Sequence, residues 1–263
     1  LLKGSLEMHS NPKISIITVC LNSASTLRGT IESIIQQDYQ NIEYIIIDGG
    51  STDGTLEIIE EYKARINYSI SEKDNGIYDA MNKGIEVATG DIVGILNSDD
   101  FYPNNYILSI VSKAFSKNSC DAVYGDLVYV DKINISKINR YWQAGEYTTS
   151  KIKNGWMLPH PTFFVKKRFY NKYGLYNTDF KSAADYEMIL KLLYKHNINV
   201  IYIPMILVKM REGGISNSNL WNRIRANKED SLAWTRNQLN KPMFVRVKKP
   251  LLKIRQFFLK PKI

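Results

Sequence analysis

Two adjacent carboxylates, Asp99 and Asp100, follow a short apolar run at residues 92–96. A run of this length between turn residues is typical of a strand buried on both faces of a sheet. Unpaired charges are too costly to bury in such a core, so the carboxylates belong where the strand emerges. Ligands of open α/β sheets collect at that end of the strands, and Mg²⁺ and Mn²⁺ prefer carboxylate and phosphate oxygens. The segment therefore predicts either a metal–diphosphate site or a turn before the next helix, which Asp also favours.

Two earlier strand-like runs end in polar residues as well. Residues 13–22 end in Asn22, and residues 42–48 end in Asp48. Helical patterns are expected between the runs, up to about residue 37, up to about residue 65 and over 77–89. This alternation predicts a parallel sheet with helices on both faces. Because parallel strands present their carboxyl ends to one edge, the polar residues should converge there.

Composition and glycine spacing exclude several classes of protein. Cys20 and Cys120 lie in apolar contexts, typical of small core residues in a reducing compartment rather than of a disulfide or a metal pair. Three scattered histidines cannot form a zinc site, and no run of about 18 apolar residues could span a membrane. The glycines of residues 49–54 match neither the dinucleotide-binding pattern nor the P-loop. A nucleotide bound here would have to be held by carboxylates and a metal.

The basic residues are concentrated at the C-terminal end. The chain carries a net charge of +9, but residues 1–208 hold 21 Lys and Arg against 23 Asp and Glu, whereas residues 209–263 hold 14 against 3. Apolar residues recur every three or four positions within 241–263, among eight basic residues and no acid. This pattern favours an amphipathic helix lying on an anionic membrane surface. A nucleic-acid patch or a docking helix is less favoured, because no nucleic-acid-binding fold accompanies the segment.

Three segments carry recognisable motifs in a fixed order: the opening strand 14–22, the segment Ile47-Asp48-Gly49-Gly50-Ser51-Thr52-Asp53-Gly54-Thr55, and residues 90–100. This ordered set resembles the GT-A-fold glycosyltransferases of family 2, over roughly residues 13–216. The resemblance implies an α/β fold with a Rossmann-like, mostly parallel central sheet and helices on both faces. Residues 13–100 would form the nucleotide-binding part and 101–216 the acceptor part. A disordered or expression-derived lead-in at 1–12 and a basic amphipathic helical extension at 217–263 would flank this domain.

The resemblance also implies a nucleotide-sugar donor, most simply a UDP-sugar, and a divalent cation, Mn²⁺ or Mg²⁺. Asp99 and Asp100 fall on the acidic metal motif, with Asp99 as the primary ligand. The family usually has Asp where this chain has Asn97, which supplies no charge. Asp48 is expected to face the base and ribose. The full set of expected donor contacts is Thr18, Asn22, Asp48, Asp74, Asp99, His160 and Arg211.

Four of the candidate residues also have a purely structural interpretation. Asp74 is equally suited to cap the helix that follows it. His160, fixed between two prolines, fits either the wall of a site or a buried hydrogen bond. Asp126, beside a glycine in a strand, fits either a sugar contact or a β-bulge. Arg211, followed by two glycines, either binds the diphosphate or precedes a plain turn.

Asp185 lies in the first turn of an expected helix. A carboxylate there is favoured by the helix dipole, which is a structural explanation for it. The resemblance implies a sharper role, because Asp185 matches the acidic residue that acts as general base in inverting members. Such a carboxylate takes the proton of the acceptor hydroxyl as the new bond forms.

These observations predict an inverting glycosyltransferase that uses a glycan or lipid-linked acceptor in cell-surface polysaccharide synthesis. It would be cytoplasmic and peripheral on the inner face of the membrane, with no nucleic-acid partner. One alternative is a sugar-nucleotide pyrophosphorylase, although no glycine-rich loop containing arginine follows the first strand. The other is a non-catalytic sugar- or membrane-binding homologue, for which Asn97 is the one indication.

Overall fold

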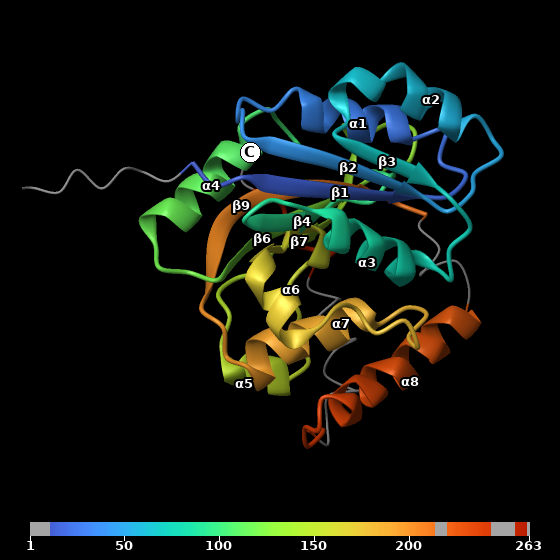
Figure 1. The fold of residues 1–263 in the computed structure, drawn as a ribbon. Coiled ribbons are helices and arrows are strands. Elements are labelled where there is room, and N and C mark those ends of the chain that lie inside the picture. Colours follow the sequence, from blue (N-terminus) through green and yellow to red (C-terminus); the bar gives the residue numbers. More distant parts are fainter. Residues whose placement is uncertain (1–10, 214–219, 243–255, 262–263) are drawn as a thin grey trace, which may run out of the picture.

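Four parallel strands form one half of the central sheet in the computed structural model, which describes residues 11–213, 220–242 and 256–261. They are β1 (Ile14–Cys20), β2 (Ile42–Asp48), β3 (Tyr68–Ser71) and β4 (Ile92–Ile95). β1 pairs with both β2 and β4, and β2 pairs with β3. The apolar runs of β1, β2 and β4 are buried on both faces, as predicted, whereas β3 is mostly exposed. The carboxyl ends of the four strands share one edge (Figure 1). Residues 1–10 of the lead-in predicted at 1–12 lie outside the described residues.

The other half of the sheet contains antiparallel pairs that the sequence pattern did not reveal. Its strands are β5 (Asp100–Phe101), β6 (Ala122–Val130), β7 (Ile138–Trp142), β8 (Phe164–Lys166) and β9 (Val200–Arg211). β8 joins the halves, antiparallel to both β4 and β6. β6 and β9 are parallel, while β7 pairs antiparallel with β6 and β5 with β9. The resulting strand order is β3-β2-β1-β4-β8-β6-β9-β5.

Helices cover both faces of the sheet, which confirms the expected layering (Figure 1). The described helices of the main domain are α1 (Leu27–Ile35), α2 (Thr55–Glu61), α3 (Ile77–Val87), α4 (Ile107–Lys117), α5 (Thr149–Lys153), α6 (Lys167–Tyr173) and α7 (Ala184–Ile189). Ile14 and Ile16 pack with residues of α1 and α4, whereas Ile17 and Val19 pack with residues of α3, α6 and α7. Alternate side chains of one strand therefore build two separate cores.

The region predicted as a basic helical extension, 217–263, includes a helix that packs on the main domain. The C-terminal half of helix α8 (Leu220–Arg236) packs on α7, and its residues Ala233 and Trp234 are fully buried. Most of the amphipathic helix predicted for 241–263 lies outside the described residues, but 256–258 form a turn rather than a helix. The carbonyl of Gln256 accepts a hydrogen bond of 3.0 Å from the backbone N–H of Tyr141 in β7. No helix in the described ranges is long and apolar enough to cross a membrane.

Glu43 anchors the opposite edge of the sheet, at the amino ends of the strands. Its carboxylate accepts hydrogen bonds from Ser15 Oγ at 2.5 Å, from Thr89 N and Oγ1 at 2.7 and 2.5 Å, and from Lys13 Nζ at 3.0 Å. Burial alone would raise the pKa of Glu43, but these donors outweigh it and lower the pKa to about 2. The ionised carboxylate therefore links β1, β2 and the loop before β4.

Glu43→Gln should lower the free energy of unfolding by about 1–3 kcal/mol near neutral pH, because buried donors lose a charged acceptor. The folded-state pKa of Glu43 lies below its usual value, so its contribution is present above about pH 4.5 and is lost as the pH falls toward 2. The difference between wild type and variant in urea unfolding should therefore narrow from pH 6 to pH 3. The exposed pair Glu60–Lys63 provides the control, since Glu60→Gln should change stability little. A difference that widens on acidification would contradict this assignment.

Candidate active site at the carboxyl edge of the sheet

Three loops interlock at the carboxyl ends of β1, β2 and β4. The backbone N–H of Asn22 donates to Ser51 Oγ at 2.7 Å, and Asn22 Oδ1 accepts from the N–H of Thr52 at 2.9 Å. Ser23 Oγ and Ser98 Oγ lie 2.8 Å apart. The predicted convergence of polar residues at one edge is therefore found, and Asn22 joins the first two loops.

Asp48 shapes its own loop rather than facing outward, contrary to the expectation that it faces the nucleotide. Its buried carboxylate accepts hydrogen bonds from Ser71 Oγ at 2.6 Å, from the N–H groups of Ser51 and Gly50 at 2.8 and 3.0 Å, and from Ser51 Oγ. Burial alone would raise the pKa of Asp48, but these hydrogen bonds outweigh it and lower the pKa below its ordinary value. Both oxygens of the ionised group are thus occupied within the protein.

The side chain of Asp74 lies at the same edge, packed directly against Gly49. Its Oδ2 lies 2.5 Å from the position that a Cβ on Gly49 would occupy, so a side chain at residue 49 would displace it. Asp74 Oδ1 accepts a hydrogen bond of 2.9 Å from the N–H of Gly76, which is the N-cap residue of α3. The carboxylate therefore fixes the turn before α3 without being the N-cap itself. Gly49 leaves the room for it beside the Asp48 loop.

The acidic pair sits in a tight turn after β4. The N–H of Asp100 donates to the carbonyl of Asn97 at 3.0 Å, and the hydroxyl of Thr30 on α1 lies 2.7 Å from the carbonyl of Asp100. Asp100 is fully buried, whereas Asp99 is partly exposed. Burial and the neighbouring Asp99 raise the pKa of Asp100 well above its usual range, although Arg211 opposes them. Burial likewise raises the pKa of Asp99.

Unsatisfied oxygens in this turn fit the binding of a hard cation. Asp100 Oδ1 and Asn97 Oδ1 are both buried and lack a hydrogen-bond partner, a costly state for polar atoms unless something else binds them. Nowhere in the described residues do three or more His, Cys, Asp or Glu side chains form a metal-binding group. The turn therefore offers at most two carboxylates and an amide oxygen, and a Mg²⁺ or Mn²⁺ ion would complete its shell with phosphates and water.

Arg211, the last residue of β9, supplies a positive charge to this turn. Its Nη1 donates to the carbonyl of Asp99 at 2.8 Å, and its guanidinium lies 4.5 Å over the ring of Phe101. A Cβ on Gly29 of α1 would stand 3.0 Å from Arg211 Nη2. Burial lowers the pKa of Arg211, while Asp100 and Asp99 pull it upward. The predicted contact of Arg211 with a diphosphate remains a prediction; of the two glycines that follow it, Gly214 lies outside the described residues.

Asp185 is held by two side chains from distant parts of the chain. His160 Nδ1 lies 3.0 Å from Asp185 Oδ2, and the hydroxyl of Tyr78 donates to Asp185 Oδ1 at 3.3 Å. The side chain of Asp185 is 15% exposed and that of His160 31% exposed, so the pair borders the surface. Burial and the charge of Asp185 raise the pKa of Tyr78, which keeps the phenol protonated as a donor. The sequence predicted His160 and Asp185 but not Tyr78.

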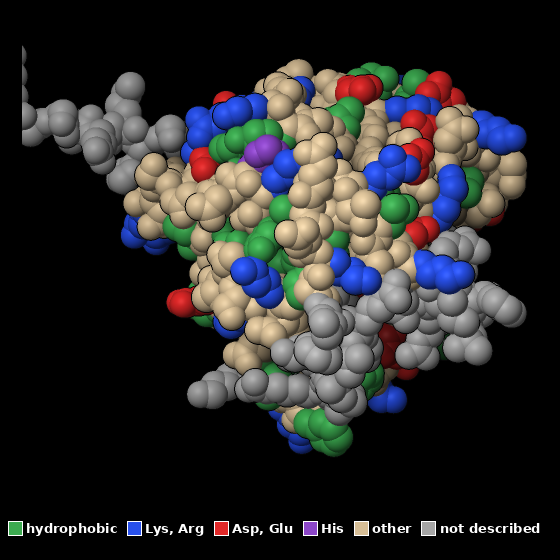
Figure 2. Space-filling view, turned by 90° about the horizontal axis from the view of Figure 1, so that it is seen from below, with side chains coloured by type: hydrophobic (Ala, Val, Ile, Leu, Met, Phe, Trp, Pro, Cys, Tyr) green, Lys and Arg blue, Asp and Glu red, His purple; other side chains and the backbone are tan. Residues whose placement is uncertain are grey.

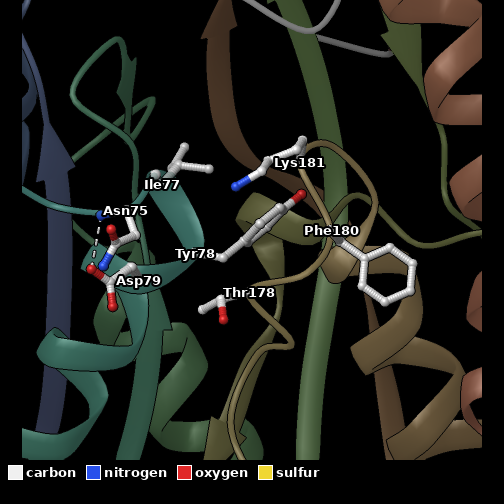
Figure 3. Close-up of a pocket in the computed structure, with 8 residues that line it drawn as sticks. Asn75, Ile77, Tyr78, Asp79, Thr178, Phe180 and Lys181 are labelled. Carbon is white, nitrogen blue, oxygen red and sulfur yellow. Dashed lines mark hydrogen bonds between the residues drawn. The ribbon is translucent and has the colours of Figure 1, made fainter.

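A small pocket lies beside Tyr78, between the start of α3 and the loop before α7. Figure 3 shows the ring of Tyr78 between Thr178 and Lys181, with Asp79 accepting a hydrogen bond from the N–H of Asn75 at 3.0 Å. The volume of the pocket is about 20 Å³, enough for one water molecule. The pocket is therefore too small to hold a nucleotide sugar.

The phenol of Tyr129 on β6 is affected by the charges of both Asp100 and Asp185. Burial raises the pKa of its phenol, Arg140 opposes this, and the carboxylates of Asp100 and Asp185 raise the pKa further. Both carboxylates therefore act on one phenol. No motif or spacing signalled Tyr129, because its place depends on the pairing of β6 with β9.

Two candidate residues turn out to be structural. Thr18 is fully buried in the middle of β1, where its Oγ1 accepts a hydrogen bond of 3.2 Å from the hydroxyl of Tyr44, so it does not reach the edge. Asp126 is buried at a register shift between β6 and β9. It accepts from the hydroxyls of Tyr141 and Tyr202 at 2.5 and 2.7 Å and from the N–H of Ala144 at 2.8 Å. The bulge interpretation of Asp126 is therefore confirmed.

Comparisons with known proteins agree with this geometry. The chain belongs to glycosyl transferase family 2, whose model matches residues 15–177. A PGL/p-HBAD biosynthesis glycosyltransferase of Mycobacterium bovis is 27% identical over 212 residues, which cover 79% of this chain and 80% of that protein. The family decides against the pyrophosphorylase alternative.

Solved structures of low sequence identity share the fold. A fragment of S. aureus TarS in complex with UDP-GlcNAc has a TM-score of 0.66 at 18% identity, covering 87% of this chain and 68% of the fragment. A mannosyltransferase from Pyrobaculum calidifontis, in complex with GDP-Man and Mn²⁺, has a TM-score of 0.65 and covers 94% of this chain and 70% of its own. The predicted GT-A architecture is thus confirmed.

Gly49→Ala should displace Asp74, because the new Cβ would lie 2.5 Å from Asp74 Oδ2. Asp74 is a side chain that can rotate away, so we expect the variant to fold normally. If Asp74 contributes to nucleotide binding, Gly49→Ala and Asp74→Ala should weaken it by a similar factor in calorimetric titration. The double variant should be no weaker than either single variant, since both remove one interaction. Additive losses would show that Gly49 and Asp74 act separately.

Proposed function

We propose that this chain transfers a sugar from a nucleotide-sugar donor, most simply a UDP-sugar, to a hydroxyl group with inversion at the anomeric carbon. The observation that carries the proposal is the Asp185 carboxylate, held by His160 and Tyr78. Asp185 and Asp100 both raise the pKa of the Tyr129 phenol, so the charges of the two carboxylates act on the same group. One carboxylate is thereby available for proton transfer, and a separate pair for the diphosphate and its cation. Separate acid–base and anion-binding groups are what a single displacement requires.

In this mechanism the acceptor hydroxyl attacks the anomeric carbon from the face opposite the nucleotide. Asp185 takes the hydroxyl proton as the new C–O bond forms, and the bond from the anomeric carbon to the diphosphate oxygen breaks with its electron pair on the nucleoside diphosphate. His160 and Tyr78 orient Asp185 for this step by contacting one carboxylate oxygen each. A bound Mg²⁺ or Mn²⁺ would stabilise the negative charge on the diphosphate.

Asn97, Asp99 and Asp100 are the residues that would hold the cation, with the partly exposed Asp99 as the proposed primary ligand. Arg211 adds a fixed positive charge to the same turn through its bond to the Asp99 carbonyl. Donor binding to this arrangement is supported by the structural neighbours solved with UDP-GlcNAc and with GDP-Man and Mn²⁺. Asp74 is the carboxylate best placed for the nucleoside, because that of Asp48 is already occupied.

The acceptor that we propose is a glycan or a lipid-linked sugar at the cytoplasmic face of the membrane, in the synthesis of a surface polysaccharide or glycolipid. A relative's name refers to PGL biosynthesis, and another similar protein is a chondroitin synthase. Phe257 and Phe258 are 60% and 81% exposed within the basic C-terminal segment, and the guanidinium of Arg140 in β7 lies 5.2 Å from the ring centroid of Phe257. Figure 2 shows that Lys and Arg side chains are also spread over the described part of the face seen from below, mostly among polar side chains and backbone. Aromatic and basic side chains together favour an anionic bilayer.

Asp185→Asn and Asp99→Ala should separate turnover from donor binding. Calorimetric titration of UDP, GDP and CMP, with Mn²⁺ and with EDTA, identifies the nucleotide, and release of that nucleotide from its sugar conjugate measures turnover. Asp185→Asn should lower turnover about 10²- to 10⁴-fold, the usual effect of a lost general base, with nucleotide affinity unchanged. Asp99→Ala should abolish the metal-dependent part of binding. If wild type binds no nucleotide, the chain is a non-catalytic homologue instead.

Phe257→Ser/Phe258→Ser should weaken binding to liposomes that contain anionic lipid, because two exposed aromatic side chains no longer enter the interface. Sedimentation with neutral and with anionic liposomes, at low and at high salt, measures the apolar and ionic parts separately. Ile133→Ser is the matched control: Ile133 is 93% exposed but lies in the loop between β6 and β7. Equal binding of wild type and double variant would exclude this surface.

A further inference from the structure

Glu229 of α8 caps the segment that leads into α7. Its carboxylate accepts hydrogen bonds from the N–H of Ser182 at 2.8 Å, the N–H of Lys181 at 3.1 Å and the hydroxyl of Ser182 at 3.1 Å. The N-cap residue of α7, Ala183, provides no side-chain hydrogen bond of its own. The start of a helix leaves N–H groups without intrahelical partners. A residue 47 positions away in sequence therefore fixes the backbone just before this helix.

Two further residues fix the helix after Asp185. Trp234 is fully buried, and its Nε1 donates to the hydroxyl of Tyr186 at 3.0 Å. The buried Asn237 donates through Nδ2 to the carbonyl of Glu187 at 3.1 Å. Figure 1 shows α8 against α7 on the side away from the sheet. The bonds from α8 and from Asn237, the residue after it, thus bracket Asp185, at residues 181 and 182 before it and at 186 and 187 after it.

We infer that Glu229, with Trp234 and Asn237, is a positioning residue for Asp185. This inference rests on the proposed role of Asp185 as general base. Helix α7 has six residues and continues directly into a π-helix at Leu190–Lys195, and an isolated helix of about this combined length is only marginally stable in water. His160 and Tyr78 orient the carboxylate, but the backbone that carries it is fixed from the opposite side by α8. A misplacement of about 1 Å at a reacting group can cost about 100-fold in rate, so this attachment bears directly on turnover.

The inference also redefines the catalytic unit. The family match ends at residue 177, and the sequence predicted the region after 216 to be an extension. Through Glu229, the helix that begins at Leu220 supports the backbone that carries the proposed base. Nine residues after β9, which ends at Arg211, the chain enters this helix. Helix α8 therefore comes soon after Arg211, the proposed diphosphate contact, and it also supports the proposed base.

Glu229→Ala and Glu229→Gln, made in the full chain, test this role. Hydrolysis of UDP-GlcNAc and of GDP-mannose provides kcat and KM, with calorimetry for nucleotide affinity. We expect kcat to fall about 10- to 100-fold in Glu229→Ala, with KM and nucleotide affinity within about twofold of wild type. Glu229→Gln keeps one acceptor oxygen and should lie between Glu229→Ala and wild type. Arg236→Ala is the control on the same helix, since it removes only the exposed pair with Asp179 and should leave kcat unchanged.

Hydrogen–deuterium exchange of residues 181–189 separates positioning from general stability. Selective faster exchange of this segment, together with the fall in kcat, supports the inference. Faster exchange with unchanged kcat overturns it, and so does a fall in kcat that is matched by loss of nucleotide affinity and of thermal stability. If wild type binds no nucleotide and hydrolyses neither donor, the proposed function itself fails. Active wild type with unaltered Glu229 variants refutes only the positioning role.

Discussion

Placing several carboxylates at one edge of a sheet costs electrostatic free energy, and the way each is compensated determines what it can do. Asp48 has donors on both oxygens, which hold its pKa low and commit it to the architecture of the loop. Asp100 has an orphaned oxygen, and its pKa is raised by burial and by Asp99. The first is a satisfied structural anion. The second is a site that gains from a cation.

The half of the sheet that contains antiparallel pairs brings a compensating positive charge to the acidic turn. The two-residue strand β5 pairs antiparallel with the end of β9, with Asp100 opposite Met210. This pairing places Arg211 directly beside the acidic turn, where it bonds the Asp99 carbonyl. β9 in turn runs parallel to β6, which carries Tyr129 near both acidic groups. Because β8 is antiparallel to both β4 and β6, strands β6 and β9 run in the same direction as β4, and the carboxyl end of β9 with Arg211 lies at the same edge as the acidic turn.

The sequence predicts those features whose cause is local. The strands 14–20 and 42–48 were predictable because strands buried on both faces are continuously apolar. β8, with three residues, and β5, with two, carry too little pattern to be found. The role of Asp48 depends on donors such as Ser71, and Tyr78 meets Asp185 across 107 positions of sequence. Thr18 was placed at the site by resemblance, although its hydroxyl lies inside the core.

The position of the proposed base depends on contacts from three other elements as well as on its own helix. Asp185 is contacted by His160 from a 3₁₀ turn, by Tyr78 from α3, and indirectly by Glu229 from α8. Each element is fixed separately: the turn at 160–162 is bonded through Thr162 to Gly125 of β6, and Trp234 anchors α8 in the main core. Three independent supports constrain the carboxylate more than α7 could alone. Precision at this site is therefore a property of the tertiary structure, which is why the motif around Asp185 does not reveal it.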